Sequence, residues 1–201
     1  MIGYEHIMKM YRDGVVAFRM KDVVKATGIS EQAIRRDIKK LIKDGIIIEI
    51  KKGIYAFSKY NQFQIACAIA KMHTNNYYIG SAGAMDFNKM TEQIPAVFII
   101  ITDNYRDKIK IKGETFIYRI RRNKKAFTGY IEKDGVRWSN KAKTVADMFE
   151  SKNFHDPSGI MEIIRENKIP KNDIEKYFKQ MNYQKYKEIF NYVFSGWHGK
   201  R

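Results

Sequence analysis

The sequence has little cysteine, fewer acidic than basic residues, and no long apolar run. Cys67 is the only cysteine among 201 residues, so an intrachain disulfide is excluded and a reducing cytoplasm is the expected location. No apolar run is longer than that at residues 96–101, which is much shorter than the roughly 18 residues of a membrane-spanning helix. The first residues also lack the charged and then apolar order of a signal peptide. We therefore expect a soluble cytoplasmic protein with no membrane partner.

The charge balance is strongly basic. Lys and Arg total 38 against 22 Asp and Glu, which gives a formal net charge of +16. Because 44% of the residues are hydrophobic, the chain can bury a core, and disorder throughout is excluded. The positive excess is spread along the chain, which favours a surface that attracts a polyanion such as nucleic acid. A lysine-rich surface that serves only solubility explains the same charge equally well.

Near the N-terminus, the spacing predicts three helices with a tight turn between the second and the third. Apolar residues recur at helical intervals in residues 4–12, 20–27 and 31–44. Gly28 is expected to end the second helix, and Ser30 to cap the free N–H groups of the third. Two helices joined by so short a turn form a helix-turn-helix pattern.

The third predicted helix has an apolar face and a face rich in hydrogen-bond donors. Its core stripe is expected to contain Ile34, Ile38, Leu41 and Ile42. The opposite face is suited to DNA, because Arg and Gln bond base edges in the major groove and Lys bonds phosphates. An ordinary solvated helix usually mixes acids evenly with bases, which this helix does not do. The DNA-contacting residues predicted for this helix and its cap are Ser30, Gln32, Arg35, Arg36, Lys39 and Lys43.

A basic hairpin is predicted to follow the third helix. The β-rich runs at residues 46–50 and 54–57 are joined by a turn containing Lys51, Lys52 and Gly53. A hairpin beside a recognition helix can reach flanking phosphates or the minor groove, so Lys51 and Lys52 join the predicted DNA surface. The order of these elements predicts a winged helix-turn-helix DNA-binding domain over residues 1–60.

Residues 61–201 are predicted to form a mixed α/β domain that ends in helices, so the fold class is α+β. An apolar helix at residues 61–72 leads into it. Strands are expected at residues 77–79, 96–102, 108–111, 115–121, 127–131 and 136–138. Helices are expected at residues 81–89, 143–150, 157–166, 171–181 and 183–194. The last two helices are rich in aromatic side chains, for which core packing is the favoured interpretation over a protein interface.

A second group of cations follows the strand predicted at residues 115–121. If that strand alternates, Arg119 and Arg121 share a face opposite to Tyr118. Such a face would offer a second contact for phosphates, although a solvated strand end and turn is an equally good interpretation. The residues of this possible second contact are Arg119, Arg121, Arg122, Lys124 and Lys125.

Enzymatic and metal chemistry have little support in the sequence. Glu49 and Lys51 have the Glu-x-Lys spacing of some metal-dependent nucleases, but the nearest upstream acids belong to the third helix rather than to a neighbouring strand. The four histidines are scattered and do not match the spacing of a closed zinc site. We expect no catalytic residues, no metal and no cofactor, and we keep a metal-dependent nuclease as the third alternative.

The order of motifs in the second unit resembles the AbiEi antitoxin family of type IV toxin-antitoxin systems. The matching stretches are residues 77–85, the apolar strand at 97–102, the basic strand at 116–122 and the Lys-Thr-x-x-Asp helix at 142–148. The resemblance covers residues 4–164. The helix after Ser81 departs from the family, because it continues Asp-Phe-Asn-Lys-Met where the family has His-Gly-Leu.

This resemblance implies a promoter-binding autorepressor that recognises inverted repeats and whose second domain helps to neutralise a nucleotidyltransferase-like toxin. A dimer on DNA is one arrangement that would suit inverted repeats. Its implied partners are double-stranded DNA and that toxin. The alternative is a protein-interaction module whose main task is neutralisation of a toxin, with DNA binding secondary.

Overall fold

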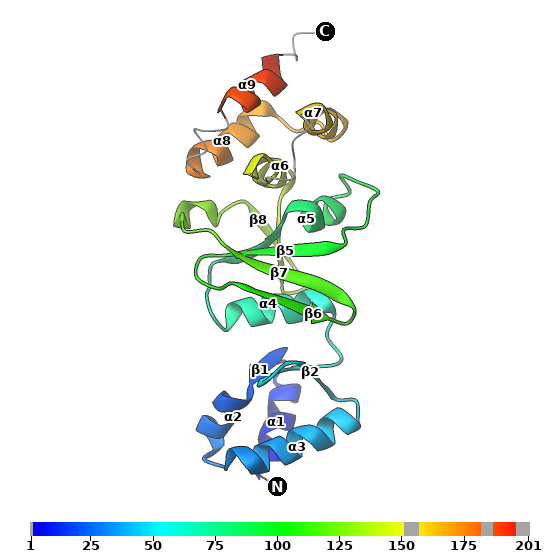
Figure 1. The fold of residues 1–201 in the computed structure, drawn as a ribbon, viewed down its shortest axis with the longest axis vertical. Coiled ribbons are helices and arrows are strands. Elements are labelled where there is room, and N and C mark those ends of the chain that lie inside the picture. Colours follow the sequence, from blue (N-terminus) through cyan, green and yellow to red (C-terminus); the bar gives the residue numbers. More distant parts are fainter. Residues whose placement is uncertain (1, 151–156, 182–186, 196–201) are drawn as a thin grey trace.

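The computed structural model describes residues 2–150, 157–181 and 187–195. Its elements form layers along the long axis of the molecule, with the N-terminal helices at one end and the C-terminal helices at the other (Figure 1). A small sheet, one helix and a six-stranded sheet lie between them. The predicted α+β fold, with a winged helix followed by a mixed α/β region and helices, is confirmed.

The N-terminal unit packs three helices on a three-stranded sheet. Its helices are α1 (Ile2–Arg12), α2 (Met20–Thr27) and α3 (Glu31–Lys43), and its strands are β1 (Ala17–Arg19), β2 (Ile47–Lys51) and β3 (Ile54–Phe57). The strand order is β1-β3-β2 with antiparallel pairs. The sequence analysis missed β1, because three residues are too few to show a period of two. Buried Ile7, Phe18, Leu41 and Phe57 belong to the core of this unit.

The second unit is built on a mixed six-stranded sheet with the order β6-β7-β5-β4-β9-β8. Its strands are β4 (Tyr77–Gly80), β5 (Val97–Thr102), β6 (Asp107–Ile111), β7 (Glu114–Ile120), β8 (Tyr130–Lys133) and β9 (Val136–Ser139). The strand predicted at residues 127–131 begins later, because residues 124–126 form the short 3-10 helix η1 (Lys124–Ala126), which the Asn123 side chain caps.

Helix α4 (Gln62–Lys71) joins the two units through a shared core. Asn61 and Gln64 cap its start reciprocally, a capping box. Ala56 of the small sheet, Ile65 of α4 and Phe116 of the large sheet belong to one buried cluster. Lys112 Nζ also donates to the carbonyl oxygens of Ser58 and Tyr60 at 2.8 and 2.6 Å. The small sheet is therefore packed against the second unit.

The remaining helices lie on the other side of the large sheet from α4 (Figure 1). They are α5 (Ser81–Phe87), α6 (Lys141–Glu150), α7 (Pro157–Glu166), α8 (Lys171–Met181) and α9 (Lys187–Ser195). Phe149, Phe178 and Phe190 pack ring against ring in their core, as the aromatic pattern predicted, whereas Tyr192 is exposed. Residues 183–186 of the last predicted helix lie outside the described part of the chain. No helix in the described ranges is long and apolar enough to cross a membrane.

Candidate nucleic-acid interface

The turn between α2 and α3 is set by Gly28 and Ser30. Gly28 has φ 67°, a left-handed conformation that glycine adopts without steric cost, and its N–H donates to the Val24 carbonyl at 2.9 Å. Ser30 caps α3, because its Oγ accepts a hydrogen bond from the Ala33 N–H at 3.4 Å. Gly28, which ends α2, and Ser30, which begins α3, thus set the geometry of the helix-turn-helix.

The apolar stripe of α3 holds the helix against the N-terminal core. Ile34, Ile38 and Leu41 are 0–1% exposed. The prediction for Ile42 is wrong, because this side chain lies at the margin of the stripe and is 36% exposed. The stripe is therefore narrower than predicted, which leaves more of the helix surface free.

The opposite face of α3 is open to solvent at one end of the molecule. Helix α3 lies on the side of the winged helix that is remote from the large sheet (Figure 1). The structure brings the predicted residues of this helix together on one exposed surface. The exposed residues are Ser30, Gln32, Arg35, Arg36, Lys39 and Lys43.

The two neighbouring arginines of α3 differ in their partners. Arg35 Nη2 lies 2.7 Å from Glu31 Oε1, one turn earlier, and this hydrogen bond raises the pKa of Arg35. Within the described ranges Arg36 forms no ion pair, so its guanidinium has no acidic partner to exchange. Because Arg36 has no such partner to displace on binding, it is the better placed of the two to bond a base edge.

The two lysines predicted at the hairpin tip, Lys51 and Lys52, lie in different environments. Lys51 is the last residue of β2, and its Nζ forms an ion pair with Asp107 of β6 and a 3.3 Å hydrogen bond with Tyr105. Burial raises the Asp107 pKa, but the Lys51 and Tyr105 hydrogen bonds outweigh it and the net shift is downward. Lys52 is exposed. Lys52 is the more exposed of the pair, and Lys51, whose side chain is 39% exposed, ties the hairpin to the second unit.

The prediction that Arg119 and Arg121 share an exposed cationic face of β7 is wrong for Arg121. Arg119 is exposed, but β7 ends at Ile120 and Arg121 turns inward, where it is 8% exposed. The backbone N–H of Arg121 donates to the Thr102 carbonyl at 2.7 Å, so the chain stays beside β5 for one residue beyond the end of β7. Arg121 is therefore removed from the candidate DNA-binding residues.

The other cations of this group lie far from α3. Arg122, Lys124 and Lys125 are exposed beside α8, since Asn123 Nδ2 donates to the Gln180 carbonyl at 2.9 Å. Helices α3 and α8 lie toward opposite ends of the long axis (Figure 1). The structure thus does not bring these cations into one surface with the recognition helix.

Arg121 instead belongs to a buried charged cluster that the sequence analysis did not foresee. Asp147 Oδ1 lies 2.7 Å from Lys143 Nζ and 2.8 Å from Arg121 Nη1, and the Tyr78 hydroxyl contacts all three side chains. Lys143 is 0% exposed. Burial raises the Asp147 pKa, but Lys143 and Arg121 more than offset this, so the pKa is lowered. The i, i+4 spacing of Lys143 and Asp147 was the only signal in the sequence.

This cluster links the sheet to the helices above it. Tyr78 lies on β4, Arg121 follows β7, and Lys143 and Asp147 lie on α6. The other carboxylate oxygen of Asp147, Oδ2, is buried with no hydrogen-bond partner among the described atoms. The cluster lies in the interior, on the far side of the large sheet from α3, so it is not part of the candidate DNA-binding surface.

No metal centre is visible in the described ranges, where no group of three or more His, Cys, Asp or Glu side chains is placed to hold a metal ion. Cys67 is 1% exposed, and burial raises the pKa of its thiol to about 12. A thiol with so high a pKa carries almost no thiolate at neutral pH and is chemically inert.

Comparison with known proteins agrees with this geometry. Residues 16–59 match the DeoR-like helix-turn-helix domain family. The fold is similar to the crystal structure of the RV2827C protein from Mycobacterium tuberculosis, with a TM-score of 0.58 and 10% sequence identity over 94% of this chain and 74% of that one. The curated proteins give no significant match. The match places a DeoR-like helix-turn-helix domain at residues 16–59, and this domain supports a DNA-binding transcriptional regulator.

Proposed function

We propose that this regulator is an autorepressing antitoxin of AbiEi type that binds inverted repeats in its own promoter. The observation that carries the DNA-binding part is the exposed row of donors on α3, a helix that lies at the end of the molecule remote from the large sheet. Support for the antitoxin part comes from the motif order in residues 77–148 that resembles the AbiEi family. A dimer would place one α3 in each half-site.

The residues of α3 divide into two roles. Arg36 and Gln32 bond base edges in the major groove, where Arg recognises guanine and Gln recognises adenine. Lys39, Lys43 and Lys52 bond phosphates, which positions the helix without reading the sequence. Arg35 contributes when it exchanges Glu31 for a phosphate. In this proposal the protein performs no reaction, and its place of action is the cytoplasm, where the promoter lies.

The proposed partner beyond DNA is a nucleotidyltransferase-like toxin. Arg119, Arg122, Lys124 and Lys125 remain candidates for a second contact with nucleic acid, separate from α3. Because they lie near the opposite end of the molecule, a contact there would involve a different stretch of polyanion. The structure gives these residues exposure and charge, which is the support for this part of the proposal.

A gel-shift titration with the DNA upstream of the gene tests the DNA-binding part. Arg36→Ala is expected to weaken specific binding by about 1–3 kcal/mol while leaving nonspecific binding nearly unchanged. Lys52→Ala should weaken all DNA alike and reduce the salt slope by about 1. Lys108→Ala, an exposed lysine on β6, is the control and should change neither quantity. The reverse pattern for Arg36 and Lys52, or no salt-sensitive complex at all, contradicts the proposal.

The toxin partner is tested separately, through the neighbouring genes. If an adjacent gene encodes a nucleotidyltransferase-like protein that arrests growth, co-expression of the present chain should restore growth. Growth that stays arrested despite intact promoter binding rejects the antitoxin part alone.

A further inference from the structure

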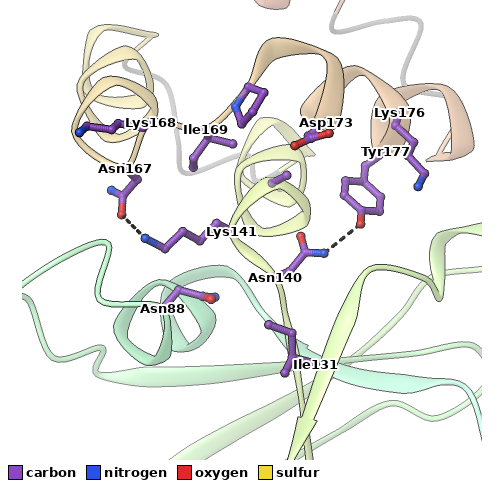
Figure 2. A pocket seen from close by; sticks show the side chains of 12 residues that line it. Asn88, Ile131, Asn140, Lys141, Asn167, Lys168, Ile169, Asp173, Lys176 and Tyr177 are labelled. Atoms are coloured by element: carbon purple, nitrogen blue, oxygen red, sulfur yellow. Dashed lines mark hydrogen bonds between the residues drawn. The ribbon is translucent and has the colours of Figure 1, made fainter.

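A pocket lies between the large sheet and the C-terminal helices, on the far side of the sheet from α4. Its volume is about 580 Å³, and it is bordered by Asn88 after α5, the start of α6, the loop before α8, and α8 itself. Figure 2 shows Asn140 and Lys141 near the centre of the view, Lys168 and Asp173 above them, and Ile131 of β8 below. The volume is within the range of natural ligand sites.

The wall that contains Tyr177 is rigidly built. Asn140 Nδ2 donates to the Tyr177 hydroxyl at 2.9 Å, and Asn140 Oδ1 accepts from the Lys143 N–H at 2.9 Å (Figure 2). Gly129 lies so close that a Cβ there would meet the Tyr177 ring at 2.4 Å. Because the Tyr177 oxygen accepts from Asn140, its own proton is left to be donated to an occupant of the pocket.

The pocket is rich in donors and positively charged. Lys141, Lys168 and Lys176 line it against one carboxylate, Asp173. Lys141 Nζ donates to Asn167 Oδ1 at 3.0 Å, whereas Lys168 and Lys176 are exposed and form no ion pair in the described part of the chain. Ammonium groups thus outnumber carboxylates around the pocket, which favours an anionic occupant.

Strand β8 presents an open edge beside this pocket. In the described ranges β8 pairs with β9 alone, and all four of its residues are exposed. Tyr130 is 40% and Ile131 46% exposed, one on each face of this edge strand. An open strand edge with exposed apolar side chains favours the addition of another strand.

We propose that β8 and the pocket bind an extended acidic segment of a partner protein. The segment adds to the sheet as a strand along β8, its apolar side chains cover Ile131, and its carboxylates bind Lys168 and Lys176. A strand edge with apolar side chains favours a peptide over nucleic acid, whose phosphates require neither. A second copy of this chain is disfavoured, because its charge of +16 repels the same lysines. This inference does not depend on the proposed operator or toxin.

The test is a selection of random dodecapeptides displayed on phage against the full-length protein. Peptides rich in Asp and Glu that alternate with apolar residues are expected. The best peptide is then synthesised with a fluorescent label, and its affinity is measured by anisotropy. The double variant Lys168→Glu/Lys176→Glu should weaken binding at least tenfold, and Ile131→Glu should weaken it as well. The matched control Lys108→Glu/Lys110→Glu reverses two exposed lysines on the opposite edge strand, β6, and should have little effect.

The site of binding is checked by hydrogen exchange, in which the peptide should protect the amides of residues 130–133 and not those of 107–111. Selection of basic or neutral peptides, equal binding by the Lys168/Lys176 variant, or protection of β6 overturns the inference. The inference is also overturned if the chain forms a dimer that Ile131→Glu abolishes, because the β8 edge would then bind a second copy of the chain. Gel shifts with the same variants should be unchanged, so failure of the peptide test and failure of DNA binding are separate results.

Discussion

The strongest stability prediction concerns Asp147, whose carboxylate lies between two buried cations. Asp147→Asn keeps the shape of the side chain and removes its charge. The Lys143 and Arg121 cations, at 2.7 and 2.8 Å from Oδ1, then lose this counter-charge in an environment where they are 0% and 8% exposed. Breaking a buried ion pair by removing one partner costs about 3–5 kcal/mol.

This cost is a large fraction of the roughly 5–15 kcal/mol that separates a folded domain from its unfolded state. For 201 residues the unfolding entropy is about 0.4 kcal/mol/K, so Asp147→Asn should lower the melting temperature by about 7–12 °C. Differential scanning calorimetry or urea unfolding followed by circular dichroism measures it. The matched control is Glu31→Gln, which removes the acid of the exposed i, i+4 pair with Arg35 and should have no measurable effect, because water screens that pair.

The effect should also depend on pH in a defined direction. The pKa of Asp147 is lowered in the folded protein, so its charge stabilises the fold above the ordinary aspartate pKa, and this contribution is lost as pH falls through the lowered value. The difference between wild type and Asp147→Asn should therefore be full at neutral pH and shrink in strong acid. Equal melting temperatures for wild type and Asp147→Asn at pH 7, or a difference that grows in acid, would refute the reasoning.

Three further predictions concern packing and reactivity. Gly129→Ala should lower the free energy of unfolding in urea more than Gly135→Ala does. Both glycines have positive φ, 72° and 73°, but a Cβ at Gly129 would meet the Tyr177 ring at 2.4 Å, whereas a Cβ at Gly135 would meet nothing within 4 Å. Equal costs would show that Tyr177 moves aside freely. Gly83→Ala should destabilise by about 1–3 kcal/mol despite the better helix propensity of alanine, because its Cβ would lie 2.8 Å from Phe98; a gain in stability contradicts this. Cys67, with its pKa raised to about 12 by burial, should react with a disulfide reagent at pH 8 only after denaturation, and rapid labelling of the native protein would argue against its burial.

The features that the sequence predicted correctly are those set by local periodicity. The faces of α3 follow from a helical repeat over thirteen residues, so Ile34 and Ile38 could be assigned to the core and Arg36 to the surface. The turn before α3 depends on two residues with strong conformational preferences, Gly28 and Ser30. Such features need no knowledge of what lies beyond the element.

The features that the sequence did not predict depend on contacts between distant segments. The alternating pattern predicted that Arg121 shares the exposed face of Arg119. The strand ends one residue earlier, however, and the Arg121 side chain turns inward to Asp147, which is 26 residues away. Lysine side chains are almost never fully buried, so no sequence pattern predicts that Lys143 is buried. Lys51 turned out to contact Asp107, because the small sheet packs on the second unit.

The packing of the small sheet on α4 limits the spacings of DNA half-sites to which the protein can bind. A DNA-binding unit on a flexible linker tolerates half-sites at many spacings, whereas Ala56, Ile65 and Phe116 in one core fix α3 relative to the second unit. In a dimer the separation of the two recognition helices would then be a property of the whole assembly, measured in turns of the duplex. If the proposed dimer binds two half-sites, insertion of about 5 bp between them would move the second half-site to the opposite face of the DNA, out of reach of so rigid a pair.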